Sequence, residues 1–168
     1  MSEIHNQKAA EILTKVIYIT LATVSKDGQP WNSPLYSAFD KDLNFYWASD
    51  YKSIHSSNIK TNNKVFSVIY DSTMKEGTGE GVYFTGKAYQ LSQATEILTA
   101  LKVMDERIGK QKERHAEKYM GVNPLRVYKV IPEKFWMNDD EKDENGKYVK
   151  DIKVEVPINE LKELIAKK

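Results

Sequence analysis

The stretch YITLATVSKDGQPWNSPLY, residues 18–36, decides the fold class. It opens with a run of β-branched, aromatic and small residues that is typical of a strand. The turn that follows contains Asp27-Gly28, and Asp-Gly between two strand-like runs is a strong hairpin signal. The return strand, expected over 30–38, contains Pro30 and Pro34, which mark an edge, a bulge or a barrel corner because proline cannot donate to the ladder. The sequence therefore predicts an antiparallel β-hairpin here.

The rest of the chain predicts further strands joined by turns, with helices between them. Gly86 and Pro132 each interrupt a strand, which indicates a bend or a close backbone approach. No repeat or long linker is visible, so residues 1–168 are expected to form one domain. Strands are expected over 43–48, 64–70, 82–91, 126–137 and 148–156, and helices over 2–15, 50–60, 92–108 and 159–167. This order predicts a mainly β, α+β fold, a β-barrel with added helices rather than alternating βαβ units.

Composition excludes several classes of protein. The chain has no cysteine, which excludes a disulfide scaffold, a cysteine nucleophile and cysteine-ligated metal sites. With 25 basic and 24 acidic residues it shows no basic excess, so we expect no nucleic-acid partner. The most apolar early run, 16–24, is too short to span a membrane, and the N-terminus lacks the order of a signal peptide. We expect a cytoplasmic protein without a membrane segment.

Four polar residues gather where the helix over 50–60 is expected to begin: Ser49, Lys52, Ser53 and His55. Ser49 or Asp50 is the expected N-cap. Backbone N–H groups at a helix start bind phosphate well when hydroxyls and a cation add charge-assisted bonds. Lys52 and His55 are three residues apart and can share a helix face. The cluster predicts a phosphate site; the alternative is a helix cap, a surface serine and an exposed histidine.

Four blocks of sequence, in order over roughly 18–137, resemble the pyridoxamine 5′-phosphate oxidase-like family. These blocks are residues 27–36, 45–59, 81–88 and 127–136. The resemblance implies an antiparallel, Greek-key-like split β-barrel of the FMN-binding type. It also implies a homodimer with the cofactor at the subunit interface.

The resemblance further implies a set of cofactor-binding residues. On the hairpin and the next strand, side chains and backbone N–H groups would face the flavin, while the serines, the lysine and the histidine hold its phosphate. Leu35, Trp47 and the partner subunit's Trp136 would wall the ring. The full set is Ser33, Pro34, Leu35, Trp47, Ala48, Ser49, Lys52, Ser53, His55 and Trp136.

The sequence also departs from the family pattern. Ser33 stands where the family's oxidases often carry a phosphate-binding arginine, and Ile54 and His55 stand where they carry a basic pair. The Arg-rich block for the substrate phosphate and the Arg-Leu-His-type segment near the C-terminus are missing from the sequence. The vitamin oxidase reaction is therefore not expected.

The predicted function is that of an FMN-dependent oxidoreductase passing hydride or electrons between a reduced nicotinamide or other small molecule and flavin. The sequence names no general acid or base, and we expect no metal site; the acidic run 139–144 is interpreted as a solvated loop. Three alternatives stay open: a non-catalytic flavin-binding stress-response module, a haem-binding or haem-degrading barrel, and a deazaflavin in place of FMN.

Overall fold

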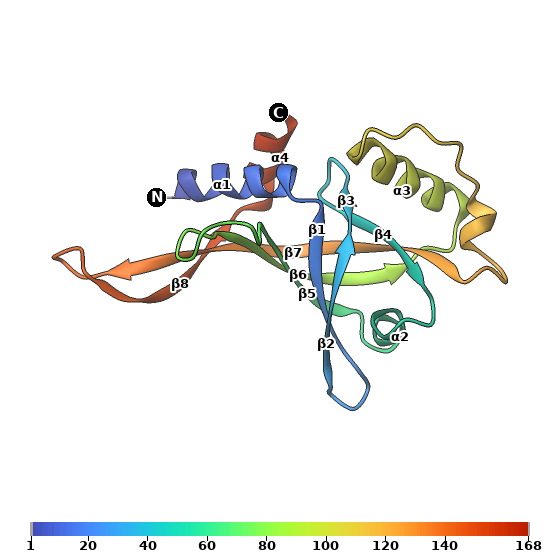
Figure 1. Ribbon diagram of the computed structural model, residues 1–168, viewed down its shortest axis with the longest axis horizontal. Helices are drawn as coiled ribbons and strands as arrows, with labels where there is room; N and C mark the ends of the chain where they lie inside the picture. The colour runs from blue at the N-terminus through green and yellow to red at the C-terminus, as the bar shows by residue number, and fades with distance from the viewer. Residues whose placement is uncertain (1, 168) are drawn as a thin grey trace.

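The computed structural model describes residues 2–167, which form one antiparallel sheet with helices packed around it (Figure 1). The strands are β1 (Tyr18–Val24), β2 (Pro30–Tyr36), β3 (Ala38–Phe39), β4 (Phe45–Asp50), β5 (Lys64–Tyr70), β6 (Gly81–Gln90), β7 (Leu125–Lys142) and β8 (Tyr148–Val156). The helices are α1 (Ser2–Lys15), α2 (Ile54–Thr61), α3 (Ala94–Arg107), the 3₁₀ helix η1 (Ala116–Tyr119) and α4 (Ile158–Ala166).

The strand order explains the barrel. Along the sheet it runs β2-β1-β5-β6-β7-β4-β3, and β8 pairs with β7. Only Ser37 separates β2 from β3, so the chain itself joins the two ends of this order. An antiparallel sheet with its ends brought together in this way is a split barrel, which confirms the predicted fold class.

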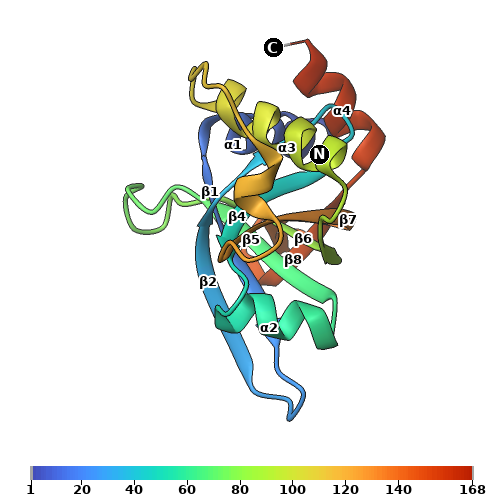
Figure 2. The ribbon, with the colours of Figure 1, turned by 90° about the vertical axis from the view of Figure 1, so that its right-hand side faces the viewer.

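Two hydrophobic clusters form the core. The larger lies inside the sheet and includes Phe45, Phe84 and Phe135, with α1 and α4 closing one end. The smaller lies between α3 and the strands β3, β4 and β7. Figure 2 shows α2 at the end of the barrel opposite α1, α3 and α4. The helix α2 therefore stands apart from the other helices.

Several predicted boundaries needed correction. Strands 18–24, 64–70 and 148–156 have the expected bounds, but the strand expected over 30–38 breaks at Ser37. The N-cap of α2 is Ser53, not Ser49 or Asp50, because β4 continues through Asp50, which pairs with Leu125. The strand interrupted at Pro132 was expected to end at Met137. β7 runs on to Lys142 and so takes in much of the acidic run expected to be a loop.

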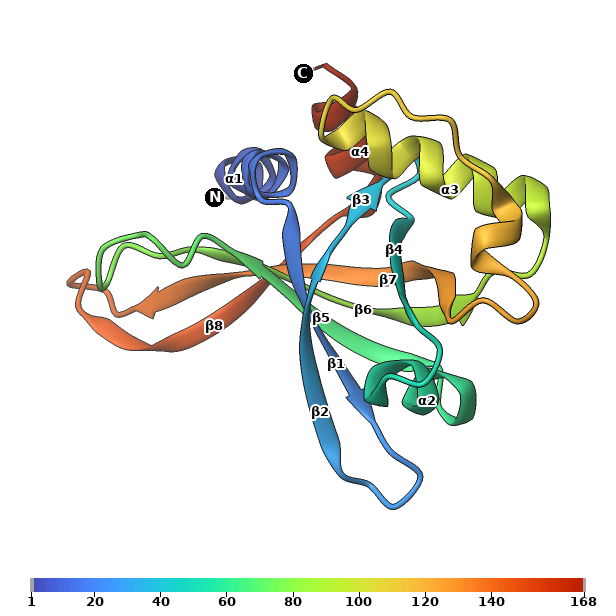
Figure 3. The same ribbon diagram turned by 45° about the vertical axis from the view of Figure 1, so that its right-hand side comes forward.

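Gly86 confirms the predicted close approach. The pairing of β6 with β7 shifts register between Thr85 and Gly86, which faces Pro132. A Cβ at Gly86 would lie 2.6 Å from the carbonyl oxygen of Ile131, a distance that real side chains do not reach. This bulge bends the two longest strands, and beyond it the β7–β8 hairpin extends away from the barrel (Figure 3).

Candidate cofactor site

The start of α2 is shaped by a short turn after β4. Asp50 Oδ1 accepts the backbone N–H of Lys52 at 2.7 Å, and the Asp50 carbonyl accepts that of Ser53 at 3.1 Å. The side chain of Ser53 then caps the helix by accepting the N–H of Ser56. This geometry brings the end of β4 and the first turn of α2 together.

His55 is the centre of the predicted polar cluster. Its Nδ1 lies 3.2 Å from Ser33 Oγ, and its Nε2 lies 3.0 Å from Ser49 Oγ and 3.1 Å from Ser53 Oγ. The imidazole is only 8% exposed. Ser49, Ser53 and His55 of the predicted cluster thus meet Ser33 of β2 in one hydrogen-bonded group, which we call the serine–histidine cluster (Ser33, Ser49, Ser53 and His55).

The neighbouring bonds favour one tautomer of His55. Ser53 Oγ donates to Ser56 Oγ at 2.8 Å, so it accepts from His55 and places the imidazole proton on Nε2. Nδ1 then accepts from the Ser33 hydroxyl, which in turn accepts from Trp31 Nε1 at 3.1 Å. Ser49 also accepts from Nε2, which leaves its own hydroxyl proton free to donate elsewhere.

Burial sets the charge of the cluster. Desolvation lowers the pKa of His55 below its usual value of 6.5, so the imidazole is neutral at pH 7. The expected second cation beside Lys52 is therefore not supplied by His55. Lys52 is exposed, and its Nζ lies 5.6 Å from the ring centroid of Tyr51. The guanidinium carbon of Arg126 lies 5.1 Å from the same centroid.

The remaining hairpin and β4 residues fall into two groups. Pro34 is exposed, whereas Leu35 and Ala48 are partly buried against the two core clusters. Trp47 is fully buried and stacks on Tyr128, with ring centroids 5.5 Å apart. Its Nε1–H has no hydrogen-bond partner among the described residues. The structure favours a packing role for Trp47, because protein covers its indole on all sides.

Trp136 lies on a different surface. Directly opposed residues face the same side of a sheet, and the registers place Pro34, Thr20, Val68, Tyr83 and Trp136 in one cross-strand row. Phe135 and Met137, which flank Trp136 in the chain, face the core. The row therefore runs across the outer side of the sheet.

The outer face of the sheet is rich in aromatic residues. Tyr18, Phe66 and Tyr70 are 56%, 40% and 48% exposed, and Phe66 packs against Tyr83 with centroids 6.1 Å apart. A hollow of about 460 Å³ opens in it, lined by residues that include Thr20, Val68 and Tyr83. Pro34 and Trp136 are four strand spacings of about 4.8 Å apart, or about 19 Å along the sheet. One chain does not bring these two predicted residues together.

A second, larger hollow lies beside α2. Its volume is about 1120 Å³, and its walls come from α2 and from the adjacent parts of β5, β6 and β7. Lys52 and Ser56 line it, so the serine–histidine cluster reaches its wall through the bond between Ser53 and Ser56. We call this hollow the α2 groove.

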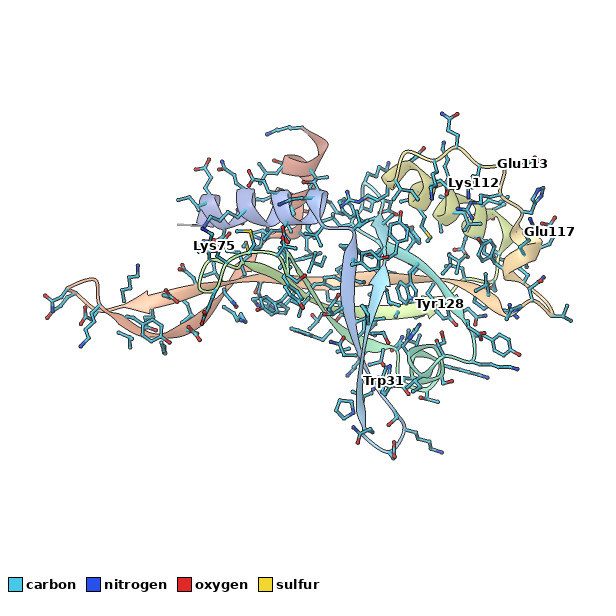
Figure 4. The ribbon with its side chains drawn as sticks, viewed as in Figure 1. Trp31, Lys75, Lys112, Glu113, Glu117 and Tyr128 are labelled. Atoms are coloured by element: carbon cyan, nitrogen blue, oxygen red, sulfur yellow. The ribbon has the colours of Figure 1, made fainter. Side chains whose placement is uncertain are left out.

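Sequence reasoning missed three members of the polar network: Trp31, Ser56 and Tyr128. Burial raises the pKa of the Tyr128 hydroxyl, and a hydrogen bond from Ser56 partly offsets this rise. Figure 4 labels Trp31 on the hairpin and Tyr128 on the sheet. The sequence did contain a signal for Trp31: residues 31 and 33 of one strand point to the same face, which places Trp31 beside Ser33. A signal for Ser56 was the spacing Ser53-x-x-Ser56, because the residue three positions after an N-cap lies next to the capping side chain.

All three histidines lie off the strands: His5 on α1, His55 on α2, and His115 just before η1. The aromatic outer face, which consists of strand residues, therefore contains no histidine among the residues that the structure describes.

Within residues 2–167, no helix has the length and apolar character needed to cross a membrane.

Comparison with known proteins identifies the family. The sequence profile described as pyridoxamine 5′-phosphate oxidase matches residues 6–139, well over half of the chain. The chain belongs to the pyridoxamine 5′-phosphate oxidase-like family. None of the curated proteins matches the sequence.

Solved structures of this family's fold carry different descriptions. A candidate 5-nitroimidazole antibiotic resistance protein from Bacteroides thetaiotaomicron has 16% identity, with 78% of this chain and 81% of that chain covered and a TM-score of 0.65. The heme storage protein HutZ from Vibrio cholerae has 18% identity, coverages of 75% and 88% and a TM-score of 0.62. A candidate pyridoxamine 5′-phosphate oxidase from Listeria innocua has 18% identity, coverages of 77% and 94% and a TM-score of 0.58. At these identities the likeness establishes the fold alone.

Proposed function

We propose that this chain binds FMN, with the cofactor phosphate at the start of α2. The observation that carries the proposal is the meeting of Ser33, Ser49, Ser53 and His55 at that helix start. First-turn N–H groups of a helix have no intrahelical partner and favour an anion. Ser49 and the helix start thus supply donors at one point, and Lys52 supplies the positive charge.

The donor set fits a phosphate held mainly by neutral groups. His55 is neutral, and Ser33 is already engaged with it and with Trp31. The free donors are the Ser49 hydroxyl, the first-turn N–H groups that Ser53 does not cap, and the Lys52 ammonium. Because a single cation faces a dianion, we expect weaker FMN binding than two charged side chains would give.

The hairpin offers a second group of donors for the flavin ring. β2 is at the end of the strand order, so alternate backbone N–H groups point away from β1. The N–H groups near Leu35 and Tyr36 are the candidates for the N5 and N1–O2 edges of the ring. Bound FMN supplies hydride or electron transfer, and we propose a reduced nicotinamide or another small molecule as the reaction partner.

A second copy of the chain completes this site. Trp136 is about 19 Å along the sheet from Pro34, farther than one flavin ring reaches. The aromatic outer face is a surface on which two copies can pack, and its burial would be favourable at about 25 cal/mol per Å². We therefore propose a homodimer in which the partner subunit's Trp136 approaches the cofactor.

The test is a titration of the protein with FMN, followed by flavin fluorescence. Lys52→Ala removes the cation assigned to the cofactor phosphate and should weaken binding about ten- to a hundredfold, the value of one charged hydrogen bond. Lys75→Ala is the matched control, because Lys75 is an exposed lysine in the loop near α1, far from α2 (Figure 4). Absence of FMN binding, or equal affinity in both variants, would overturn the phosphate placement. Oxidation of a reduced nicotinamide by the loaded protein, with an added acceptor, then distinguishes an enzyme from a binding module.

A further inference from the structure

The α2 groove has a lining of one charge sign. Three lysines line it: Lys52 before α2, Lys60 in the last turn of α2 and Lys64 at the start of β5. Among the described residues that line the groove, none is acidic. The whole chain has nearly equal numbers of acidic and basic residues, so this local imbalance is not a consequence of composition.

The positive charge of the groove is not compensated by ion pairs. Within residues 2–167, Lys52, Lys60 and Lys64 take part in no salt bridge. Lys64 lies opposite Lys87 on β6, and Lys87 is already paired with Glu133 at 3.1 Å. Lys60 and Lys64 therefore line the groove without a counterion, and such cations favour an anionic ligand.

The other lining groups suit an aromatic ring with polar edges. Tyr51 and Tyr89 are 42% and 41% exposed, and Tyr128, which also lines the groove, is only 2% exposed. Phenol rings provide stacking surfaces for a planar heterocycle. Carboxamides, which can both donate to and accept from a base edge, come from Asn62, Asn63 and Gln90.

We propose that the α2 groove binds a nucleoside phosphate, with its phosphates beside Lys60 and Lys64 and its base against the tyrosines. The helix α2 is eight residues long, which corresponds to roughly 12 Å along the groove. A mononucleotide fits that length, and a volume of about 1120 Å³ accommodates it with room to spare. As an extension that rests on the proposed function, the occupant is the adenine-nucleotide half of a nicotinamide electron donor.

The experiment is a calorimetric titration of the full-length protein with ADP, compared with adenosine and inorganic phosphate. ADP should bind more tightly than either part alone, because the lysines hold one end and the rings hold the other. The double variant Lys60→Gln, Lys64→Gln should lose roughly tenfold or more in ADP affinity. The control double variant Lys75→Gln, Lys112→Gln removes two exposed lysines from the loop near α1 and from the loop that follows α3 (Figure 4) and should bind as the native protein does.

Three outcomes would overturn the proposal. They are no ADP binding by the native protein, an equal loss in both double variants, and much tighter binding of a single-stranded oligonucleotide than of ADP. Thermal melting checks that each variant is folded. FMN titration of the Lys60, Lys64 variant keeps the two proposals apart, because neither lysine belongs to the proposed flavin site: unchanged FMN affinity with lost ADP affinity supports the groove alone.

Discussion

The serine–histidine cluster and the outer face of the sheet are opposite kinds of surface. In the cluster, polar side chains are buried or half-buried and each finds a hydrogen-bond partner in the same chain, as His55 does with three serines. On the outer face, aromatic side chains such as Tyr18 and Tyr70 are about half exposed. The cluster is complete in one chain, and the outer face presents apolar rings that a second surface can cover.

This difference separates what one copy does from what two copies do. A buried polar group without a partner costs about 1–3 kcal/mol, so a network such as the cluster is retained only when its members are satisfied together. Exposed rings carry no such penalty within the monomer, and their burial provides the driving force for association. Changes in the cluster should therefore alter stability, and changes on the outer face should alter assembly.

The largest expected effect comes from two neighbours on β7 that face opposite sides. Phe135→Ala empties a fully buried position in the aromatic core and should lower the free energy of unfolding by about 3–5 kcal/mol. Trp136→Ala, on the outer face, should cost far less in stability but shift sedimentation from dimer towards monomer. Denaturant unfolding and sedimentation on the same samples check both parts. A monomeric native protein, or a Trp136 variant as unstable as the Phe135 variant, would remove the distinction.

A smaller effect is expected from the cluster. His55→Leu leaves Ser33, Ser49 and Ser53 without their common partner and should lower the free energy of unfolding by about 1–3 kcal/mol. His55→Gln is the matched control, because its carboxamide keeps a donor and an acceptor and should recover part of the loss. Equal stability of native protein and both variants would show that the hydrogen bonds of the cluster contribute nothing.

A pH series isolates the buried imidazole. The pKa of His55 is lowered in the folded protein, whereas the unfolded chain binds a proton near pH 6.5. Between those two values the unfolded state holds more protons, so stability is full above about pH 6.5 and falls as pH drops below it. The melting temperature should therefore fall more between pH 7.5 and pH 5.5 in the native protein than in His55→Gln. Parallel pH profiles would contradict the lowered pKa, since the carboxyl groups titrate alike in both proteins.

Local patterns were enough for most of the fold. The alternating residues of 18–24 and the Asp27-Gly28 turn predicted the first hairpin, and Gly86 predicted the close approach that the bulge requires. The errors came where tertiary pairing overrode a local signal. The strand that contains Pro132 was expected to end at Met137, but pairing with β8 carries β7 on to Lys142.

The candidate site could be predicted in part. Sequence order brought Ser49, Ser53 and His55 close together, and the resemblance added Ser33 from β2. Sequence could not reveal that His55 is buried, because α2 packs against β1, β2 and β6, and β1 and β2 lie well before it in the chain. It also gave no sign of the α2 groove, whose lysines are unremarkable singly and line one hollow only because β5 lies beside α2.

The smallest expected effect concerns Trp47, the predicted cofactor wall that lies in the core. Trp47→Phe keeps a ring against Tyr128 and removes the buried Nε1–H that has no partner among the described residues. The lost packing of the second ring and the relief of the unpaired donor act in opposite directions, about 1–3 kcal/mol each. We therefore expect a net change within about 1.5 kcal/mol, measured by denaturant unfolding. Trp47→Leu, which also loses the stacking, is the control and should be clearly less stable.

The same pair of variants tests the cofactor wall directly. If Trp47 only packs the core, Trp47→Phe should bind FMN as the native protein does, since no contact with the flavin is lost. Near-native stability of Trp47→Phe together with weaker FMN binding would indicate that the Nε1–H of Trp47 donates a hydrogen bond to the cofactor. In that case part of the flavin site would lie inside the barrel, and the separation between a self-contained cluster and an outer face awaiting a second copy would no longer hold.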